Sequence, residues 1–239
     1  MEHHGTHHPG ASPACPACLG LGVRLDASLS TARALRCDCV GPCSVCEDGG
    51  WVARGPNVVA CTCHTLAERM VLYDEAGLPA ASVGPALERW ELTPLVERAT
   101  AWLTGWRPEP GSRGLVISDP APGRGERLLG ALVAELVFGL GARVRCVDLR
   151  VPDAIWPQAT EYRVLALIGL GEHEDSRALK RGLSEHESSD GSLLVATRLE
   201  PTWERTGATA SLGEVLDPSS AVTVLESCLT AVAERHRAP

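Results

Sequence analysis

The sequence predicts an α/β protein in which a parallel sheet covered by helices follows a small cysteine-rich domain. After residue 114, short runs of Val, Leu and Ile alternate with helical patterns, which is typical of parallel strands buried on both faces. Eight of the ten cysteines lie before His64, so the 239-residue chain divides unevenly. We therefore expect four segments, covering residues 1–14, 15–63, 64–110 and 111–239.

The first segment, residues 1–14, combines four histidines with Gly, Pro and Ser and is expected to be a disordered tail. It lacks the basic start and apolar run of a signal peptide, and the longest apolar stretch, residues 128–140, is interrupted by Glu135. These features predict a cytoplasmic protein with no membrane segment. In a reducing compartment, clustered cysteines indicate metal ligands rather than disulfides.

Residues 15–39 and 43–63 are two copies of one pattern: C-x-x-C, glycines, two short strand patterns around a turn, then C-x-C. The tight C-x-x-C turn directs two sulfurs to one ion, and the returning strand supplies the second pair. Four thiolates complete the tetrahedron that zinc accepts, so the pattern predicts two zinc ions. The expected ligands are Cys15, Cys18, Cys37 and Cys39 for one ion and Cys43, Cys46, Cys61 and Cys63 for the other.

Spacing alone also allows an interleaved arrangement, in which the outer four cysteines bind one ion and the inner four the other. His64, next to the last cysteine, is a substitute ligand in principle, although the thiol set is already complete. Closed four-sulfur sites serve structure and leave no open position for catalysis. Cys146 and Cys228 lie in a strand and a helix pattern and are expected to be core residues.

The connecting segment, residues 64–110, predicts helices around 66–76 and 94–102, separated by a Gly-Leu-Pro turn at 77–79. Four tryptophans in or near it are expected to seal the contact between the two domains. They are Trp51, Trp90, Trp102 and Trp106. In the last segment the expected strands are 114–119, 142–149, 162–171, 192–199 and 221–226, with helices from Gly125, near Ser176 and up to Arg237.

Residues 114–136 have the layout of strand, glycine-containing loop and helix that holds nucleotide phosphates in P-loop proteins. We interpret Gly123 and Gly125 as part of a vestigial phosphate loop. When the P-loop motif is aligned on these two glycines, its lysine position holds Glu126 and its magnesium-binding hydroxyl position holds Arg127. Of 22 basic residues only Lys180 is a lysine, so no register supplies a Gly-Lys-Ser or Gly-Lys-Thr. The residues argue against ATP as a cofactor, and a plain strand-to-helix turn is the alternative reading of these glycines.

The knuckle CSVCEDGGWV, a following C-x-C, a leucine-rich arm with Gly-Leu-Pro and the loop-containing core together resemble the bacterial DnaC/DnaI helicase loaders and related IstB-type AAA+ ATPases. The resemblance covers residues 43 to about 200. It implies a P-loop, AAA+-like αβα core with a five-stranded parallel sheet. The first cysteine copy, CPACLGLG, resembles the zinc-hairpin module that J-domain co-chaperones present to unfolded clients, but the chain has only His8-Pro9-Gly10 where that family has an HPD turn.

The resemblance implies two acidic residues at the end of the strand around 162–171, where this chain has Ile168 and Gly169. Acidic residues come only afterwards, at Glu172, Glu174 and Asp175. It also implies a small polar residue that senses the γ-phosphate, a position matched by Thr197 beside Arg198. We therefore expect a degenerate AAA+ core with no ATP hydrolysis.

The formal charge of −8 disfavours DNA and anionic lipid as ligands. The favoured function is a non-catalytic zinc-containing adaptor or scaffold that binds another protein through a basic or neutral docking face. The expected contact surface is the carboxyl edge of the sheet, near Asp119, Asp148, Gly169 and Thr197, with the zinc hairpins as a second contact. Two alternatives stay open: a helicase loader or remodelling ATPase with a divergent P-loop, and client binding by the zinc module.

Overall fold

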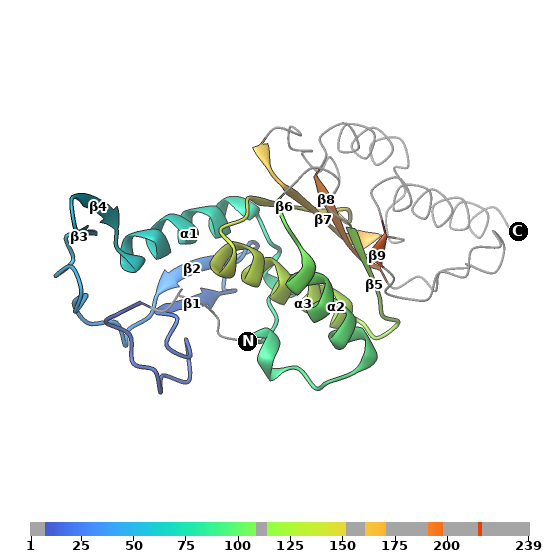
Figure 1. Ribbon diagram of the computed structural model, residues 1–239. Coiled ribbons are helices and arrows are strands. Elements are labelled where there is room, and N and C mark those ends of the chain that lie inside the picture. The colour runs from blue at the N-terminus through green and yellow to red at the C-terminus, as the bar shows by residue number, and fades with distance from the viewer. Residues whose placement is uncertain (1–7, 109–113, 152–160, 171–190, 198–214, 217–239) are drawn as a thin grey trace, which may run out of the picture.

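The computed structural model places an α/β sheet at one end of the molecule and a small hairpin at the other, joined by a long helix (Figure 1). It describes residues 8–108, 114–151, 161–170, 191–197 and 215–216. Several sequence predictions lie outside these residues: the helices near Ser176 and up to Arg237, the strand 221–226, and the positions of Glu172, Glu174, Asp175, Lys180, Arg198 and Cys228.

The sheet contains β5 (Gly114–Ser118), β6 (Val144–Asp148), β7 (Val164–Leu170), β8 (Ser192–Thr197) and β9 (Val215–Leu216), in the order β6-β7-β8-β5-β9. The first four strands are parallel and match four of the five strands predicted from the apolar runs. The α/β prediction is therefore confirmed. The resemblance implied a fifth parallel strand, whereas β9 pairs with β5 in the antiparallel direction through two residues.

Successive side chains of the four parallel strands enter two different apolar clusters, so both faces of this part of the sheet are buried. In β7, Val164, Ala166 and Ile168 belong to one cluster, and Leu165 and Leu167 belong to the other. Three helices cover the first face: α1 (Thr62–Ala76), α2 (Pro94–Gly105) and α3 (Arg124–Ala134) (Figure 1). The five-residue π-helical turn η3 (Glu135–Gly139) extends α3.

Helix α1 begins at Thr62, inside the last C-x-C, and is therefore longer than the predicted helix over 66–76. It ends at Gly77, whose φ of +68° is the left-handed conformation that glycine adopts without steric cost. The Arg69 side chain donates to the carbonyl oxygen of Phe138 in η3, and Arg145 of β6 donates to the carbonyl oxygen of Glu75. These contacts fix α1 against the sheet.

The two cysteine-rich copies differ in their packing. The first forms β1 (Val23–Asp26) and β2 (Arg33–Arg36), an antiparallel pair that lies against α1. The Asp74 carboxylate of α1 accepts a hydrogen bond from the Ala34 N–H at 2.7 Å, and Val23 and Ala34 join the apolar cluster of the sheet. The first hairpin thus packs against the apolar core of the sheet.

The second copy forms β3 (Trp51–Arg54) and β4 (Asn57–Ala60), also antiparallel. This hairpin stands beyond the first turn of α1, at the far end of the molecule from the sheet (Figure 1). Two short 3₁₀ turns, η1 (Ala80–Ser82) and η2 (Leu87–Arg89), follow α1 and lead to α2. Within the described residues, no helix has the length and apolar character needed to cross a bilayer.

Residues 8–14 differ from the disordered tail expected over residues 1–14, of which residues 1–7 lie outside the described chain. His8 is buried and its N–H donates to the Leu21 carbonyl oxygen at 3.3 Å. The Gly41 N–H donates to the Gly10 carbonyl oxygen at 3.0 Å. Burial and the neighbouring Arg36 lower the pKa of His8. Composition missed this packing because it depends on Gly22, where any side chain would collide with His8.

The tryptophans only partly act as expected. Trp102 and Trp106 of the α2 region are buried in the core, and the Trp106 indole donates to the Ser192 hydroxyl at 2.8 Å. Trp90 is half-buried, with its indole N–H on the Pro85 carbonyl oxygen. Trp51 is exposed on β3 and seals no domain contact.

Candidate metal centres and the carboxyl edge of the sheet

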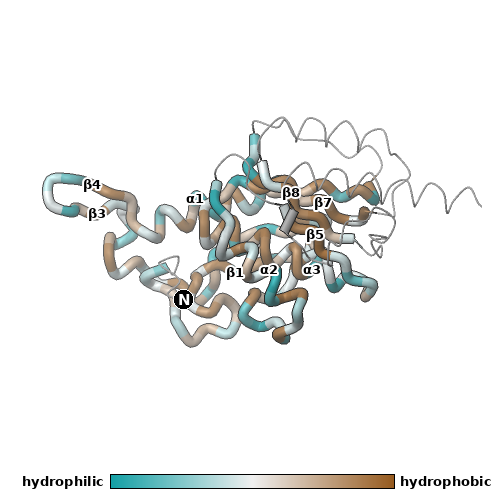
Figure 2. The backbone as a smooth tube through the Cα atoms, turned by 45° about the vertical axis from the view of Figure 1, so that its right-hand side comes forward, coloured by the Kyte–Doolittle hydropathy of each residue, from teal (hydrophilic) through white to brown (hydrophobic). Residues whose placement is uncertain are grey.

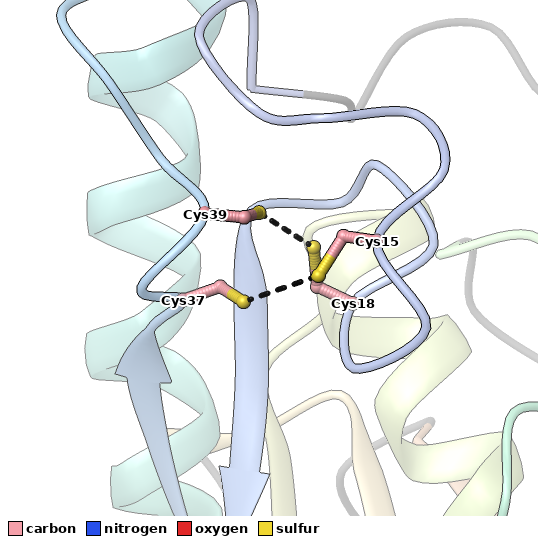
Figure 3. A group of neighbouring side chains, drawn as sticks. All are labelled: Cys15, Cys18, Cys37 and Cys39. Carbon is pink, nitrogen blue, oxygen red and sulfur yellow. Dashed lines mark hydrogen bonds between the residues drawn. The ribbon is translucent and has the colours of Figure 1, made fainter.

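The eight cysteines before His64 form two groups of four, and in each group all sulfurs lie within 4.8 Å of one another. The groups follow the sequential arrangement and not the interleaved one. In the first, the sulfurs of Cys15 and Cys37 are 3.7 Å apart and those of Cys18 and Cys39 are 3.4 Å apart (Figure 3). In the second, Cys43 and Cys61 are separated by 3.7 Å and Cys46 and Cys63 by 3.3 Å.

These distances suit one tetrahedral ion per group. Zinc–sulfur bonds of about 2.3 Å place the four sulfurs of a regular tetrahedron about 3.8 Å apart. Figure 3 shows that the first C-x-x-C comes from the loop before β1 and the C-x-C from the chain after β2, with the sulfurs pointing toward a common centre. Both groups are therefore compatible with zinc.

The two copies share their local backbone as well as their cysteine spacing. The residue after each C-x-x-C, Leu19 in the first copy and Glu47 in the second, has a φ of +51°. The N–H of Leu19 donates to the Cys15 carbonyl oxygen at 2.8 Å, and the N–H of Glu47 donates to the Cys43 carbonyl oxygen at 2.9 Å. This repeated turn orients both sulfurs of each knuckle toward the same point.

At Cys15, backbone N–H groups favour the thiolate form that a metal requires. Those of Cys18 and Ala17 lower the pKa of Cys15 to about 7. In the second group, the Gly50 N–H donates to the Cys46 sulfur at 3.3 Å. Because the protein supplies all four ligands, neither centre keeps an open position for a substrate.

His64 is not a member of either sulfur group. Its ring lies against Trp51, with centroids 5.1 Å apart, and its Nε2 is 3.5 Å from a Glu68 carboxylate oxygen. Cys146 contributes to the core beside β7, and burial raises its pKa to about 12. A thiol held protonated in this way is a poor nucleophile.

At the carboxyl edge of the sheet, the structure brings the four expected residues onto adjacent strand ends. The Asp119 N–H donates to the Thr197 carbonyl oxygen at 3.1 Å, joining the ends of β5 and β8. The Thr197 hydroxyl in turn donates to the Leu170 carbonyl oxygen of β7 at 3.1 Å. Asp148 and Gly169 lie at the ends of β6 and β7. The position matched to a phosphate sensor therefore has a structural hydrogen bond.

The two glycines in the connection from β5 to α3, Gly123 and Gly125, shape a strand-to-helix turn. Gly123 has a φ of +71° and precedes the first residue of α3. A Cβ at Gly125 would lie 3.3 Å from both Ile117 and Asp119, so glycine allows α3 to approach β5 closely. The Asp119 carboxylate accepts from the Ala121 N–H at 2.9 Å and thereby holds the loop.

An ion-pair network that the sequence analysis did not predict joins the first turn of α3 to the end of β6. The Arg150 guanidinium donates from Nη1 to both oxygens of Glu126, at 3.2 and 3.1 Å. Its Nε and Nη2 donate to the two oxygens of Asp148, at 2.8 and 3.0 Å. Both carboxylates raise the pKa of Arg150, Asp148 more strongly. The sequence signal was Glu126 itself, which lies in the first turn of an apolar helix. A carboxylate buried there needs a cation nearby.

Gly169 makes room for this arginine. It has a φ of +76° and sits at an irregularity in the pairing of β7 with β8. A Cβ at Gly169 would lie 2.7 Å from the Arg150 Cγ. The resemblance implied an acidic residue at this strand end, and the structure instead has a glycine over which the Arg150 side chain passes.

Comparisons of the chain with protein-family models, with curated proteins and with solved structures found no match. The fold and the two centres thus define an α/β protein with two four-cysteine clusters. Its similarity to helicase loaders and to the J-domain zinc module rests on the sequence motifs alone.

Proposed function

We propose that this protein is a non-catalytic, zinc-containing adaptor or scaffold that acts through protein–protein contacts, built on a degenerate helicase-loader-like AAA+ core. The observation that carries the proposal is the Glu126–Arg150–Asp148 network, which occupies the N-terminal end of α3 with the protein's own charges.

A phosphate at a helix N-terminus needs free backbone N–H groups and a nearby cation. In this protein the Glu126 carboxylate stands in the first turn of α3, with its side chain only 9% exposed. The Arg150 guanidinium, which pairs with that carboxylate, also pairs with Asp148 and is thus committed to two acidic groups. An incoming phosphate would meet a fixed negative charge and would have to break a partly buried ion pair. Both effects oppose nucleotide binding.

The two metal centres fit the same function. Four-thiolate sites select zinc, and in small hairpins the metal supplies folding free energy that a small apolar core cannot. Zinc in both centres would bring the formal charge of the chain from −8 to about −12, because each four-thiolate centre carries −2. Such a surface favours a basic or neutral protein partner over DNA.

Nucleotide titration of the zinc-loaded protein tests the proposal. Calorimetry with ATP and magnesium should give no binding heat, and phosphate release should equal that of buffer. Arg124, the first residue of α3, is an exposed cation beside this loop, with its side chain 46% exposed. Magnesium-dependent phosphate release that Arg124→Glu abolishes and the matched Arg54→Glu on β3 preserves would instead establish the divergent ATPase.

A further inference from the structure

The β3–β4 hairpin has one face made only of apolar residues. The register pairs Trp51 with Ala60 and Ala53 with Val58. Because directly opposed residues share a face and successive residues alternate, these four side chains lie on one face of the ribbon. Val52 and Val59 lie on the other face, together with the polar pair Arg54 and Asn57.

All four residues of this face, which we call the ribbon face, are exposed. Trp51 is 54% exposed and Val58 is 70% exposed. The half-buried residues Val52 and Val59 are on the opposite face. In the described part of the chain, no helix or strand packs extensively on β3 or β4, and the hairpin extends away from the body in both views (Figures 1 and 2). The His64 ring of α1 lies against Trp51, with centroids 5.1 Å apart. Neither Trp51 nor Val58 belongs to an apolar cluster of the described residues, so core packing does not explain the apolar character of the ribbon face.

The charge around the ribbon face selects its partner. Residues 43–63 contain two acids, Glu47 and Asp48, and one base, Arg54, which lies on the opposite face. With a four-thiolate zinc centre at −2, this hairpin carries a net charge of about −3. An acidic or neutral apolar partner would lack the complementary charge, and a second copy of the chain would bring an equal negative charge to the contact.

The size of the ribbon face also argues against a second copy. The two larger side chains and the two alanines expose roughly 300 Å² of apolar surface, judged from ordinary side-chain areas, whereas a stable dimer needs about 800 Å² from each partner. Strands of four residues span about 13 Å, which matches a helix of about nine residues. The ribbon face thus suits a single short helix.

We propose that the ribbon face is a docking site for a basic amphipathic helix of a partner protein, whose apolar stripe covers Trp51 and Val58 while its Lys or Arg residues face the acidic hairpin. This inference deepens the adaptor function proposed above and rests on it.

Fluorescence anisotropy with synthetic helical peptides tests the proposal on the zinc-loaded full chain. The probe is a labelled peptide with leucines on one face and lysines elsewhere, measured at about 150 mM salt, where distant surface charges are screened. Two comparison peptides replace either every lysine by glutamate or every leucine by serine. The leucine–lysine peptide should bind at least about tenfold more tightly than either, a difference of about 1.4 kcal/mol or more.

Substitutions then locate the binding site. Val58→Ser should weaken binding of the leucine–lysine peptide about tenfold, since it removes the more exposed of the two large apolar side chains of the ribbon face. Leu92→Ser, which changes another strongly exposed side chain outside the hairpin, should leave the affinity unchanged. Zinc content of both variants must stay at the wild-type value, which shows that the hairpin is intact.

Equal binding of the lysine and glutamate peptides, or an affinity that Val58→Ser does not change, would overturn the proposal. A dimer in sedimentation velocity that Val58→Ser dissociates would assign the ribbon face to a second copy instead. None of these results depends on nucleotide, so failure here is distinguishable from failure of the adaptor function, which the ATP titration tests.

Discussion

The Glu126→Gln variant tests whether the ion pair between Glu126 and Arg150 holds the carboxyl edge of the sheet together. Gln keeps the size of the side chain and removes the charge that both Nη1 contacts of Arg150 use. Breaking a fully buried ion pair costs about 3–5 kcal/mol. Here Arg150 is 31% exposed and keeps Asp148, so solvent screening and the remaining partner reduce the expected loss to about 1–2 kcal/mol.

Arg150→Gln should cost more, about 2–3 kcal/mol, because it leaves both Glu126 and Asp148 without their cation. The double variant Glu126→Gln with Arg150→Gln should lose less than the sum of the single variants by about 1 kcal/mol, because the two residues are in direct contact. Urea denaturation with an unchanged slope measures all three free energies of unfolding.

Arg124→Gln is the control, since its Nε lies 3.5 Å from Asp119 on a half-exposed side chain. It should change the free energy of unfolding by less than about 0.5 kcal/mol. A coupling free energy near zero between Glu126 and Arg150, together with a Glu126→Gln protein as stable as the control, would refute the role given to the network.

Two further predictions concern the metal centres and the packing of α3. Replacing Cys43 and Cys46 together by serine should lower bound zinc from two equivalents to one and unfold residues 43–63. The thermal transition of the core should stay in place, because few contacts join the second hairpin to it. Loss of both ions, or of the core transition, would contradict the independence of the second hairpin. Gly130→Ala should destabilise the protein by about 1–3 kcal/mol despite the better helix propensity of alanine, because its Cβ would collide with the Ser82 carbonyl oxygen. Gly139→Ala, which meets only the end of the Glu135 side chain, is the matched control, and equal urea midpoints for the two variants would rule out the collision.

Local pattern was enough to predict the four parallel strands of the sheet and the cysteines that form the two groups. The apolar runs at β5, β6, β7 and β8 are strands buried on both faces, and this composition identifies them without knowledge of their neighbours. The C-x-x-C and C-x-C repeats likewise identify the eight thiols, whereas the structure decides that each hairpin groups its own four rather than sharing them with the other.

Contacts between distant segments were decided only by the tertiary structure. Glu126 and Arg150 are 24 residues apart in the chain, and they meet although β7 and β8 separate β6 from β5, the strand that precedes α3. The cysteine repeats look alike in sequence, yet Asp74 of α1 ties only the first hairpin into the core. Composition and periodicity describe the environment a residue needs, whereas partners across the fold depend on how the elements pack. The sequence alone therefore determined the parallel strands and the clustered thiols of this protein. Packing determined which charges pair with each other and which face of the second hairpin stays exposed.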